Sequence, residues 1–467
     1  MTTLDDDLHD VHPRRQQVSM ALAVGITVPA ITLRFLNPEL PHPVDAALFG
    51  LAIVGAAFIL SWAAEVAQLD ISAGLAIAVL ALIAVLPEYA VDMVFAAKAG
   101  NAVQQFGAAC EAPGAAGETS CSLALANMTG SNRLLIGIGW SAVVFIAWWR
   151  VRTLRSRDAK DKPLPPQLGS ALASHDGKGI TLQRSNSVEI AFLALATVYS
   201  LTLPLKHSIT LIDTLILVGI FVAYTIRVAR APAGEPHLVG PARYVGTFVT
   251  RNRRIAIIVM FAFAAAIIGL CAEAFAEALV DTGKDFGVSE FLLVQWLAPL
   301  ASESPELLVA CLYAWRLNTQ SGLGTLVSSK VNQWTLLVGT LPLVFAIASA
   351  SLHGLPIDEV QREELFLTAA QSFFAVAVLS SLSLSNREAL MLFSLFWAQF
   401  ILGAIVPESL HALERIGVGV GYLVLGATIL MKDRRQVSRL LRDGFRTSYA
   451  EMSEEPTPVP ASPGRIT

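Results

Sequence analysis

The chain has 467 residues, of which 54% are hydrophobic and only 15% are charged, and its formal net charge is −4. Soluble domains carry about a quarter charged residues. The low charged fraction and a mean hydropathy of +0.59 therefore exclude an ordinary soluble protein. The near-neutral net charge gives no reason to expect a nucleic-acid partner. We expect an integral membrane protein whose partners include the lipid bilayer.

Long apolar segments recur along the whole chain. A spanning helix needs roughly 20 mainly apolar residues, and about twelve segments qualify. The first of them lacks a small-residue cleavage site and follows Arg14-Arg15, which favours a retained helix over a signal peptide. We therefore predict an all-α polytopic membrane protein. The predicted spans are 18–36, 44–64, 71–97, 122–149, 187–205, 208–229, 255–280, 288–315, 323–351, 365–384, 389–406 and 416–431.

The basic residues fall on one side of these predicted spans. They concentrate in 150–184, 227–254 and 432–446. Because cytoplasmic loops carry an excess of Lys and Arg, that side is predicted to be cytoplasmic. We expect both termini in the cytoplasm and the protein in the plasma (inner) membrane.

The connection 100–121 falls on the opposite side and contains Cys110 and Cys121. An oxidising compartment would permit a disulfide between them. Two free thiols are the alternative, and the sequence leaves both open. Cys271 and Cys311 lie inside predicted helices and are expected to be small core residues.

The chain contains two similar halves. Each half has a Pro-Glu pair in an apolar segment, Leu86-Pro87-Glu88 and Ser304-Pro305-Glu306, and a Gly/Ser/Asn-bearing segment follows each pair. Five helices per half is an odd number, so the second copy would be inverted relative to the first. The predicted units are 1–43 (cytoplasmic N-terminus and extra helix), 44–229 (first repeat), 230–254 (cytoplasmic linker), 255–406 (second repeat), 407–431 (extra helix) and 432–467 (cytoplasmic tail, first basic and then disordered).

The two Pro-Glu pairs predict an ion site between the repeats. A carboxylate in hydrocarbon is costly, so matched carboxylates in two half-chains indicate function. Each proline frees the carbonyl four residues earlier, here those of Ile83 and Ala301, and hard cations bind such oxygens together with carboxylates. We predict that Glu88 and Glu306 are shared metal-cation ligands.

Two further acids lie on the same helix faces as this pair. Asp92 follows Glu88 by one turn, and Glu303 precedes Glu306 by three residues. We predict that both contribute to the cation site. Buried ion pairs, or helix-end carboxylates that reach the membrane surface, are the alternative interpretation.

These residues resemble those of a known family. The motifs look like the two alpha repeats of the sodium/calcium exchanger family, among the calcium:cation antiporters, and the resemblance covers 44–406. The motifs that carry it are Leu86-Pro87-Glu88, Gly130-Ser131-Asn132, Gly287-Val288-Ser289-Glu290, Ser304-Pro305-Glu306 and Ser329-Lys330-Val331-Asn332-Gln333.

The chain departs from the family pattern at several positions. Small hydroxyl residues usually precede Leu-Pro-Glu, where this chain has Ala84-Val85. Lys330 and Arg133 add two fixed cations to a region that usually holds none, and we predict a coupling or charge-balancing role for both. Lys330 would then substitute for a transported sodium ion. Neutral ligand candidates, which also suit close helix packing, are Ser131, Asn132, Ser302, Ser329, Asn332 and Gln333.

The resemblance implies a secondary antiporter that exchanges Ca²⁺, or another cation, for Na⁺ or H⁺ by alternating access. Inorganic cations would be its transported partners, and no cofactor is expected. The sequence has no His-Glu-x-x-His, no Gly-x-Ser-x-Gly and no phosphate-binding glycine loop, so we do not expect an enzyme. A cation channel and a transport-inactive sensor or scaffold are the alternatives.

Overall fold

The protein is described by a computed structural model that covers residues 13–36, 40–70, 86–107, 110, 119–158, 172, 177–231, 238, 240–287 and 290–454. Within these residues, eight helical segments are long and apolar enough to cross a membrane. The predicted all-helical polytopic membrane fold is confirmed. Each of the twelve predicted spans overlaps a helix, although 208–229 begins on a short strand and 365–384 ends on one. Residues 71–85 and 288–289 lie outside the described residues.

The first half of the chain is built from helices with local start signals. Thr210 and Asp213 form a capping box that begins α12, since each side chain satisfies a free backbone N–H of the first turn. The predicted first span is divided between two helices. The helices of this half are α2 (Pro13–Gly25), α3 (Val28–Leu36), α4 (His42–Ala67), α6 (Leu86–Phe106), α7 (Ser120–Leu123), α8 (Ala126–Leu134), the π-helix η2 (Leu135–Trp140), α9 (Ser141–Asp158), η3 (Arg184–Asn186), α11 (Ser187–Ser200), η4 (Leu203–Leu205) and α12 (Leu211–Val228).

The second half uses the same signals. Asp358 and Ser385 begin α18 and α19 with capping boxes. Helix α14 begins at Thr250, so the predicted linker 230–254 is partly helical. The helices of this half are α13 (Pro241–Gly246), α14 (Thr250–Phe286), α15 (Glu290–Trp315), α16 (Thr319–Asn332), the π-helix η5 (Gln333–Leu337), α17 (Val338–Ala348), α18 (Glu359–Leu379), α19 (Asn386–Ile405), η6 (Glu408–Leu410) and α20 (His411–Lys432).

Short strands join the two halves in a symmetric way. Strand β1 (Gly179–Thr181) pairs with β4 (Ser383–Ser385), and β2 (Ser208–Ile209) pairs with β3 (Leu355–Pro356), both antiparallel. β1 and β3 precede α11 and α18, whereas β2 and β4 follow them. Each ladder thus joins a strand before a helix in one half to a strand after the matching helix in the other. A π-helix follows α8 and another follows α16, which repeats the correspondence.

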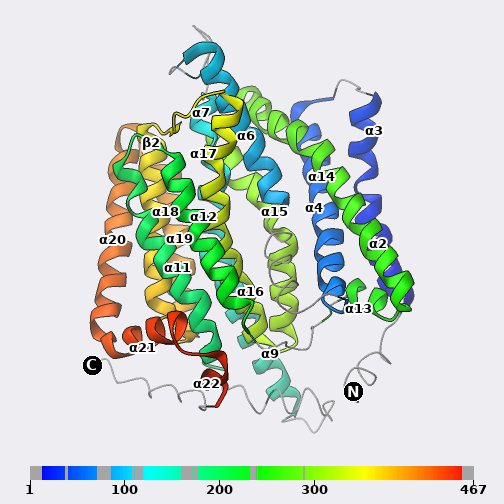
Figure 1. Cartoon of the computed structure of the whole chain (residues 1–467), viewed down its shortest axis with the longest axis vertical. Helices are drawn as coiled ribbons and strands as arrows, with labels where there is room; N and C mark the ends of the chain where they lie inside the picture. The colour runs from blue at the N-terminus through cyan, green and yellow to red at the C-terminus, as the bar shows by residue number, and fades with distance from the viewer. Residues whose placement is uncertain are drawn as a thin grey trace.

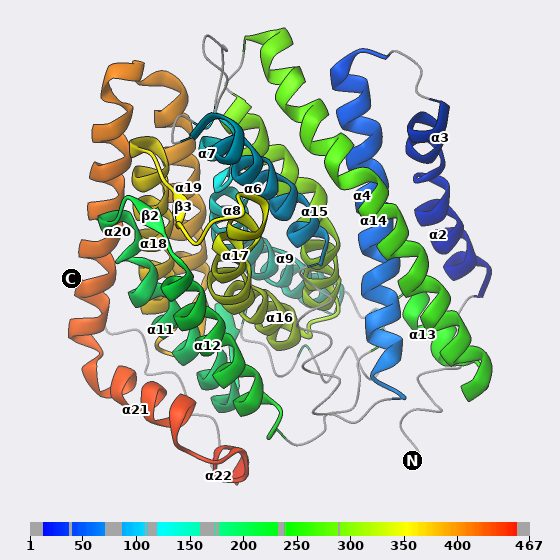
Figure 2. The ribbon, with the colours of Figure 1, turned by 45° about the horizontal axis from the view of Figure 1, so that its top comes forward.

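The helices form two hydrophobic bodies. Helices α4 and α14 pack along each other, and α2 and α3 lie against α4 (Figure 2). These four helices form most of one hydrophobic cluster, and the remaining bundle forms another. Val91 of α6 and Ala298 of α15 pack into the first body. Helices α6 and α15 therefore lie where the two bodies meet.

The C-terminal segment folds back onto the bundle as α21 (Arg434–Phe445) and α22 (Tyr449–Glu454). Arg184 donates to both carboxylate oxygens of Asp443, at 2.7 and 3.0 Å. Burial alone would raise the pKa of Asp443, but Arg184 and Thr447 outweigh it and lower that pKa below its ordinary value. The tail predicted to be disordered begins after Tyr449, and within it 450–454 belong to α22. Residues 455–467 lie outside the described residues. Figure 1 places α13, α21 and α22 at one end of the bundle and α7 and β2 at the other.

The question left open for the two loop cysteines is answered by the structure. Cys110 and Cys121 form a disulfide, with their Cα atoms 5.9 Å apart. The bond closes the connection between α6 and α7. Cys271 is buried and Cys311 is partly buried, as expected for core thiols.

Helix contact across the repeats depends on Gly130. A Cβ added there would lie 1.6 Å from the backbone carbonyl oxygen of Gln295, so α8 and α15 touch backbone to backbone. We predict that Gly130→Ala lowers the apparent unfolding midpoint, because overpacking of this kind costs at least about 1–3 kcal/mol. Gly139→Ala is the matched control, since its nearest neighbour would be Leu326 Cδ1 at 3.4 Å. Thermal unfolding in detergent checks both variants, and equal midpoints would contradict the packing account.

Candidate cation site

Four carboxylates from the two Pro-Glu helices lie inside the bundle. Glu88 and Asp92 on α6 are 2% and 0% exposed, and Glu303 on α15 is 3% exposed. Glu306, one turn further along α15, is partly buried. Buried charges are costly unless a counter-charge or hydrogen bonds compensate them. The hydrogen-bond donors and counter-charges around these acids therefore determine what the site can bind.

Glu303 lies between the two acids predicted as the shared pair. Its carboxylate shares the donors Ser131 and Gln333 with Glu88, and it interacts electrostatically with both Glu88 and Glu306. The sequence pattern paired Glu88 directly with Glu306, whereas in the structure Glu303 is the acid that shares hydrogen-bond donors with Glu88. The acids from the two helices thus converge through Glu303.

Two neutral side chains donate to the Glu88–Glu303 pair. The Ser131 hydroxyl of α8 donates to Glu88, and it lies 3.2 Å from Glu303 Oε1. Gln333 Nε2, at the start of η5, donates to Glu303 Oε1 at 2.6 Å and lies 3.3 Å from Glu88 Oε2. One helix of each repeat thus contributes a donor to the same carboxylate pair.

The second glutamate has a matching serine in its own repeat. Ser329 Oγ of α16 donates to Glu306 Oε2 at 2.6 Å. This contact repeats the Ser131–Glu88 contact of the first half. The Ala301 carbonyl, predicted to be free because Pro305 has no N–H, accepts a hydrogen bond from Ser304 Oγ at 3.1 Å. The carbonyl is therefore already satisfied here. Ile83 lies outside the described residues.

Asp92 has a partner that the sequence analysis missed. Asn127 Nδ2 of α8 donates to Asp92 Oδ1 at 2.9 Å, and both residues are fully buried. Asn127 precedes Ser131 by four residues, so the two share one face of α8. That spacing is the signal that could have identified it.

Lys330 contacts the first repeat at an equivalent position. Its ammonium donates to the backbone carbonyl and the side-chain oxygen of Asn132, and Lys330 is 0% exposed. The ring of Trp334 lies 5.7 Å from Nζ. The lysine ammonium thus binds two oxygen atoms of Asn132, and it interacts electrostatically with Glu88 and Glu303.

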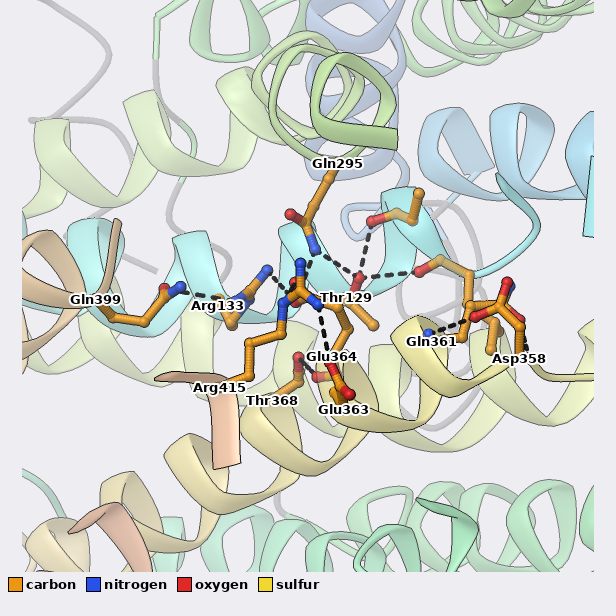
Figure 3. Close-up of polar contacts among 12 residues, drawn as sticks. Thr129, Arg133, Gln295, Asp358, Gln361, Glu363, Glu364, Thr368, Gln399 and Arg415 are labelled. Atoms are coloured by element: carbon orange, nitrogen blue, oxygen red, sulfur yellow. Dashed lines mark hydrogen bonds and ion pairs between the residues drawn. The ribbon is translucent and has the colours of Figure 1, made fainter. Parts of the chain in front are cut away.

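The remaining predicted site residues, Asn332, Ser302 and Arg133, differ in where their side chains lie. Asn332 is buried on α16, directly before Gln333. Ser302 donates to the Ala298 carbonyl of its own helix at 3.1 Å. Arg133 lies apart from the carboxylates, because its guanidinium pairs with Glu364 of α18 at 2.7 Å (Figure 3). The predicted charge balance between Arg133 and the four acids is therefore not supported by the geometry.

In the part of the chain that the structure describes, no group of three or more His, Cys, Asp or Glu side chains is arranged to hold a metal ion. The observed arrangement instead joins acids to each other and to neutral donors. Such an array can take up protons on the acids or a cation between them.

Comparison with known proteins agrees with this architecture. The family model described as "Sodium/calcium exchanger protein" matches 46–229 and 256–405, which lie within the predicted repeats 44–229 and 255–406. No match is found among curated proteins. The solved structure of the H⁺/Ca²⁺ exchanger CAX is 38% identical, with a TM-score of 0.79 over 94% of this chain and 99% of that chain. The structure of native YfkE has the same fold at 13% identity, with a TM-score of 0.54 over 87% of this chain and 100% of that one.

Both halves of the sequence and nearly the whole structure are thus accounted for by one family. The resemblance found from the motifs is confirmed, and the chain is a membrane transport protein. The chain belongs to the sodium/calcium exchanger family of secondary transporters.

Proposed function

We propose that this protein is an antiporter that exchanges Ca²⁺, or a chemically similar divalent cation, for protons. The observation that carries the proposal is the convergence of the buried carboxylates of Glu88 and Glu303 on the same two neutral donors, Ser131 and Gln333. Two ionised carboxylates repel strongly at low dielectric, so such a pair needs a shared proton or a bound cation. Competition between the two is the basis of coupling.

Divalent cations suit this set of side chains. Carboxylate, hydroxyl and amide oxygens are the ligands that Ca²⁺ prefers. We infer that Glu88, Glu303 and Glu306 hold the cation after a small rearrangement, and that Ser131 and Ser329 add hydroxyl ligands. Asp92 and Asn127 would then support the site from the next turn.

The position of Lys330 favours protons over sodium as the coupling ion. Its ammonium binds two oxygen atoms of Asn132, as a monovalent cation would. A tethered ammonium cannot be released with each cycle, so it substitutes for a transported sodium ion. The 38% identity to an H⁺/Ca²⁺ exchanger supports the same choice.

Charge counting gives a stoichiometry. Once Arg133 is assigned to Glu364, four carboxylates face one ammonium, which leaves three negative charges. Three protons would neutralise the empty site, and Ca²⁺ with one proton would neutralise the loaded site. The proposed exchange therefore releases about two protons per Ca²⁺ and leaves the buried charge unchanged.

Alternating access requires one part of the bundle to move against another. We propose that the body formed by α2, α3, α4 and α14 shifts against the rest, because α6 and α15 lie at the boundary between the two hydrophobic bodies. The end that carries α13, α21 and α22 holds the basic clusters, and we infer that it faces the cytoplasm from the plasma (inner) membrane.

A pH gradient alone should drive transport. In sealed vesicles that contain the purified protein and no sodium, we expect ⁴⁵Ca²⁺ uptake when the lumen is more acidic than the outside. An imposed sodium gradient at constant pH should have little effect. Uptake that requires sodium would contradict proton coupling. Flux that follows voltage without a counter-ion indicates a channel, and no flux in either gradient indicates a transport-inactive scaffold.

Removal of one carboxylate of the pair should stop exchange. We expect Glu88→Gln and Glu303→Gln each to lower the initial uptake rate at least about tenfold, because each removes a charge that protons and Ca²⁺ share. Glu273→Gln on α14 is the matched control, since that side chain is 55% exposed and pairs with Arg34 at 3.6 Å. Wild-type rates in Glu303→Gln would remove Glu303 from the mechanism.

The tethered lysine can be tested separately. We predict that Lys330→Asn makes uptake responsive to sodium, because a mobile cation can then occupy the oxygen atoms of Asn132. Uptake is measured with pH and sodium gradients applied one at a time. The idea is rejected if the variant remains folded and active with unchanged ion dependence.

A further inference from the structure

Figure 3 shows a second buried polar group, here called the Arg133 cluster. Arg133 and Ser131 are two residues apart, which separates them by roughly 200° around the helix. Ser131 contacts Glu88, whereas Arg133 contacts α18. The members of the cluster are Thr129, Arg133, Gln295, Glu363, Glu364, Gln399 and Arg415.

Glu364 is the centre of this cluster. Arg133 Nη2 lies 2.7 Å from Glu364 Oε2, and Arg415 Nε lies 3.0 Å from Glu364 Oε1. Gln295 Nε2 donates to Glu364 Oε2 at 3.0 Å. The side chains of Arg133 and Glu364 are 2% and 4% exposed, so neither charge is compensated by water. Arg133 therefore depends on Glu364 for its counter-charge, whereas Glu364 also has Arg415.

The cluster has no excess positive charge. Arg415 of α20 also pairs with Glu363 at 2.9 Å, and Glu414 interacts electrostatically with both arginines. The Arg133 guanidinium is further held by the Trp296 ring at 5.0 Å and by Gln399 at 3.4 Å. The cluster therefore ties α20, which lies outside the two repeats, to the core helix α8.

The same two helices build both groups of residues. Helix α8 carries Ser131 to the cation site and Arg133 to the cluster, and α15 carries Glu303 to the site and Gln295 to the cluster. At Gly130 these helices are in backbone contact. A change in how Arg133 is held therefore acts on the donors and acceptors of the cation site.

We propose that Glu364 is a positioning residue that retains Arg133 outside the cation site and thereby sets the affinity of that site for a divalent cation. This inference rests on the proposed function. Without Glu364, a buried guanidinium would lose its main counter-charge while four carboxylates lie across the same helix. Its field would compete with the cation that these carboxylates bind.

The test compares Ca²⁺ half-saturation and maximal uptake rate in vesicles. Glu364→Gln should raise the half-saturating Ca²⁺ concentration at least about fivefold, the lower end of ordinary coupling between sites, with a smaller effect on the maximal rate. The double variant Arg133→Gln/Glu364→Gln leaves no unpaired charge and should restore half-saturation toward the wild-type value. Glu363→Gln is the control, because Glu363 contacts Arg415 and its side chain is 17% exposed.

Each outcome either supports or overturns the role proposed for Glu364. Restored half-saturation in the double variant supports the proposal, even where Glu364→Gln alone fails to fold. Equal defects in the single and double variants indicate a purely structural cluster and overturn it, as does unchanged half-saturation in a folded Glu364→Gln. If the wild-type protein transports no divalent cation, the proposed function and this inference both fail. If the wild-type protein transports a divalent cation but the single and double variants show the same half-saturating Ca²⁺ concentration, only this inference fails.

Discussion

Desolvation of carboxylates is the constraint on which the rest of this structure depends. Glu88 and Glu303 meet inside an apolar bundle, and their donors are a serine and a glutamine. Neither donor carries a charge, so the pair is stable only with a proton or a cation between its oxygens. Helix packing, the π-helices and the close contact at Gly130 hold the two acids in this arrangement. Under the proposed function, the same requirement makes Ca²⁺ and protons compete for this pair.

The two repeats supply a symmetric frame, and the departures from symmetry account for the proposed chemistry. Ser131–Glu88 and Ser329–Glu306 are equivalent contacts in the two halves. Glu303 has no acidic counterpart in the first half, where Val85 precedes Leu86-Pro87-Glu88. The acids of the two inverted helices therefore do not all occur in matched pairs. Lys330 against Asn132 is a second asymmetry at a matched position.

Much of the fold was predictable from the sequence, because a span of apolar residues leaves the backbone few options other than helix. The Pro-Glu motifs also identified the helices that carry buried acids. The details of side-chain pairing were not predictable. Glu303, not Glu306, shares its hydrogen-bond donors with Glu88, and Arg133 faces Glu364 instead of the four acids. Both outcomes depend on the rotation of α8 and α15 about their axes, which a one-dimensional pattern of apolar residues fixes only loosely. Asn127 was missed because it lies outside the motif, although its spacing from Ser131 places it on the same face.

The central claim is that Ca²⁺ and protons compete for the Glu88–Glu303 pair. The most direct measurement is proton release when Ca²⁺ is added to the purified protein in lightly buffered detergent solution, followed with a pH-sensitive dye. The account predicts that about two protons leave for each Ca²⁺ bound, and that Glu303→Gln reduces this release. Saturable Ca²⁺ binding without any proton release would contradict it.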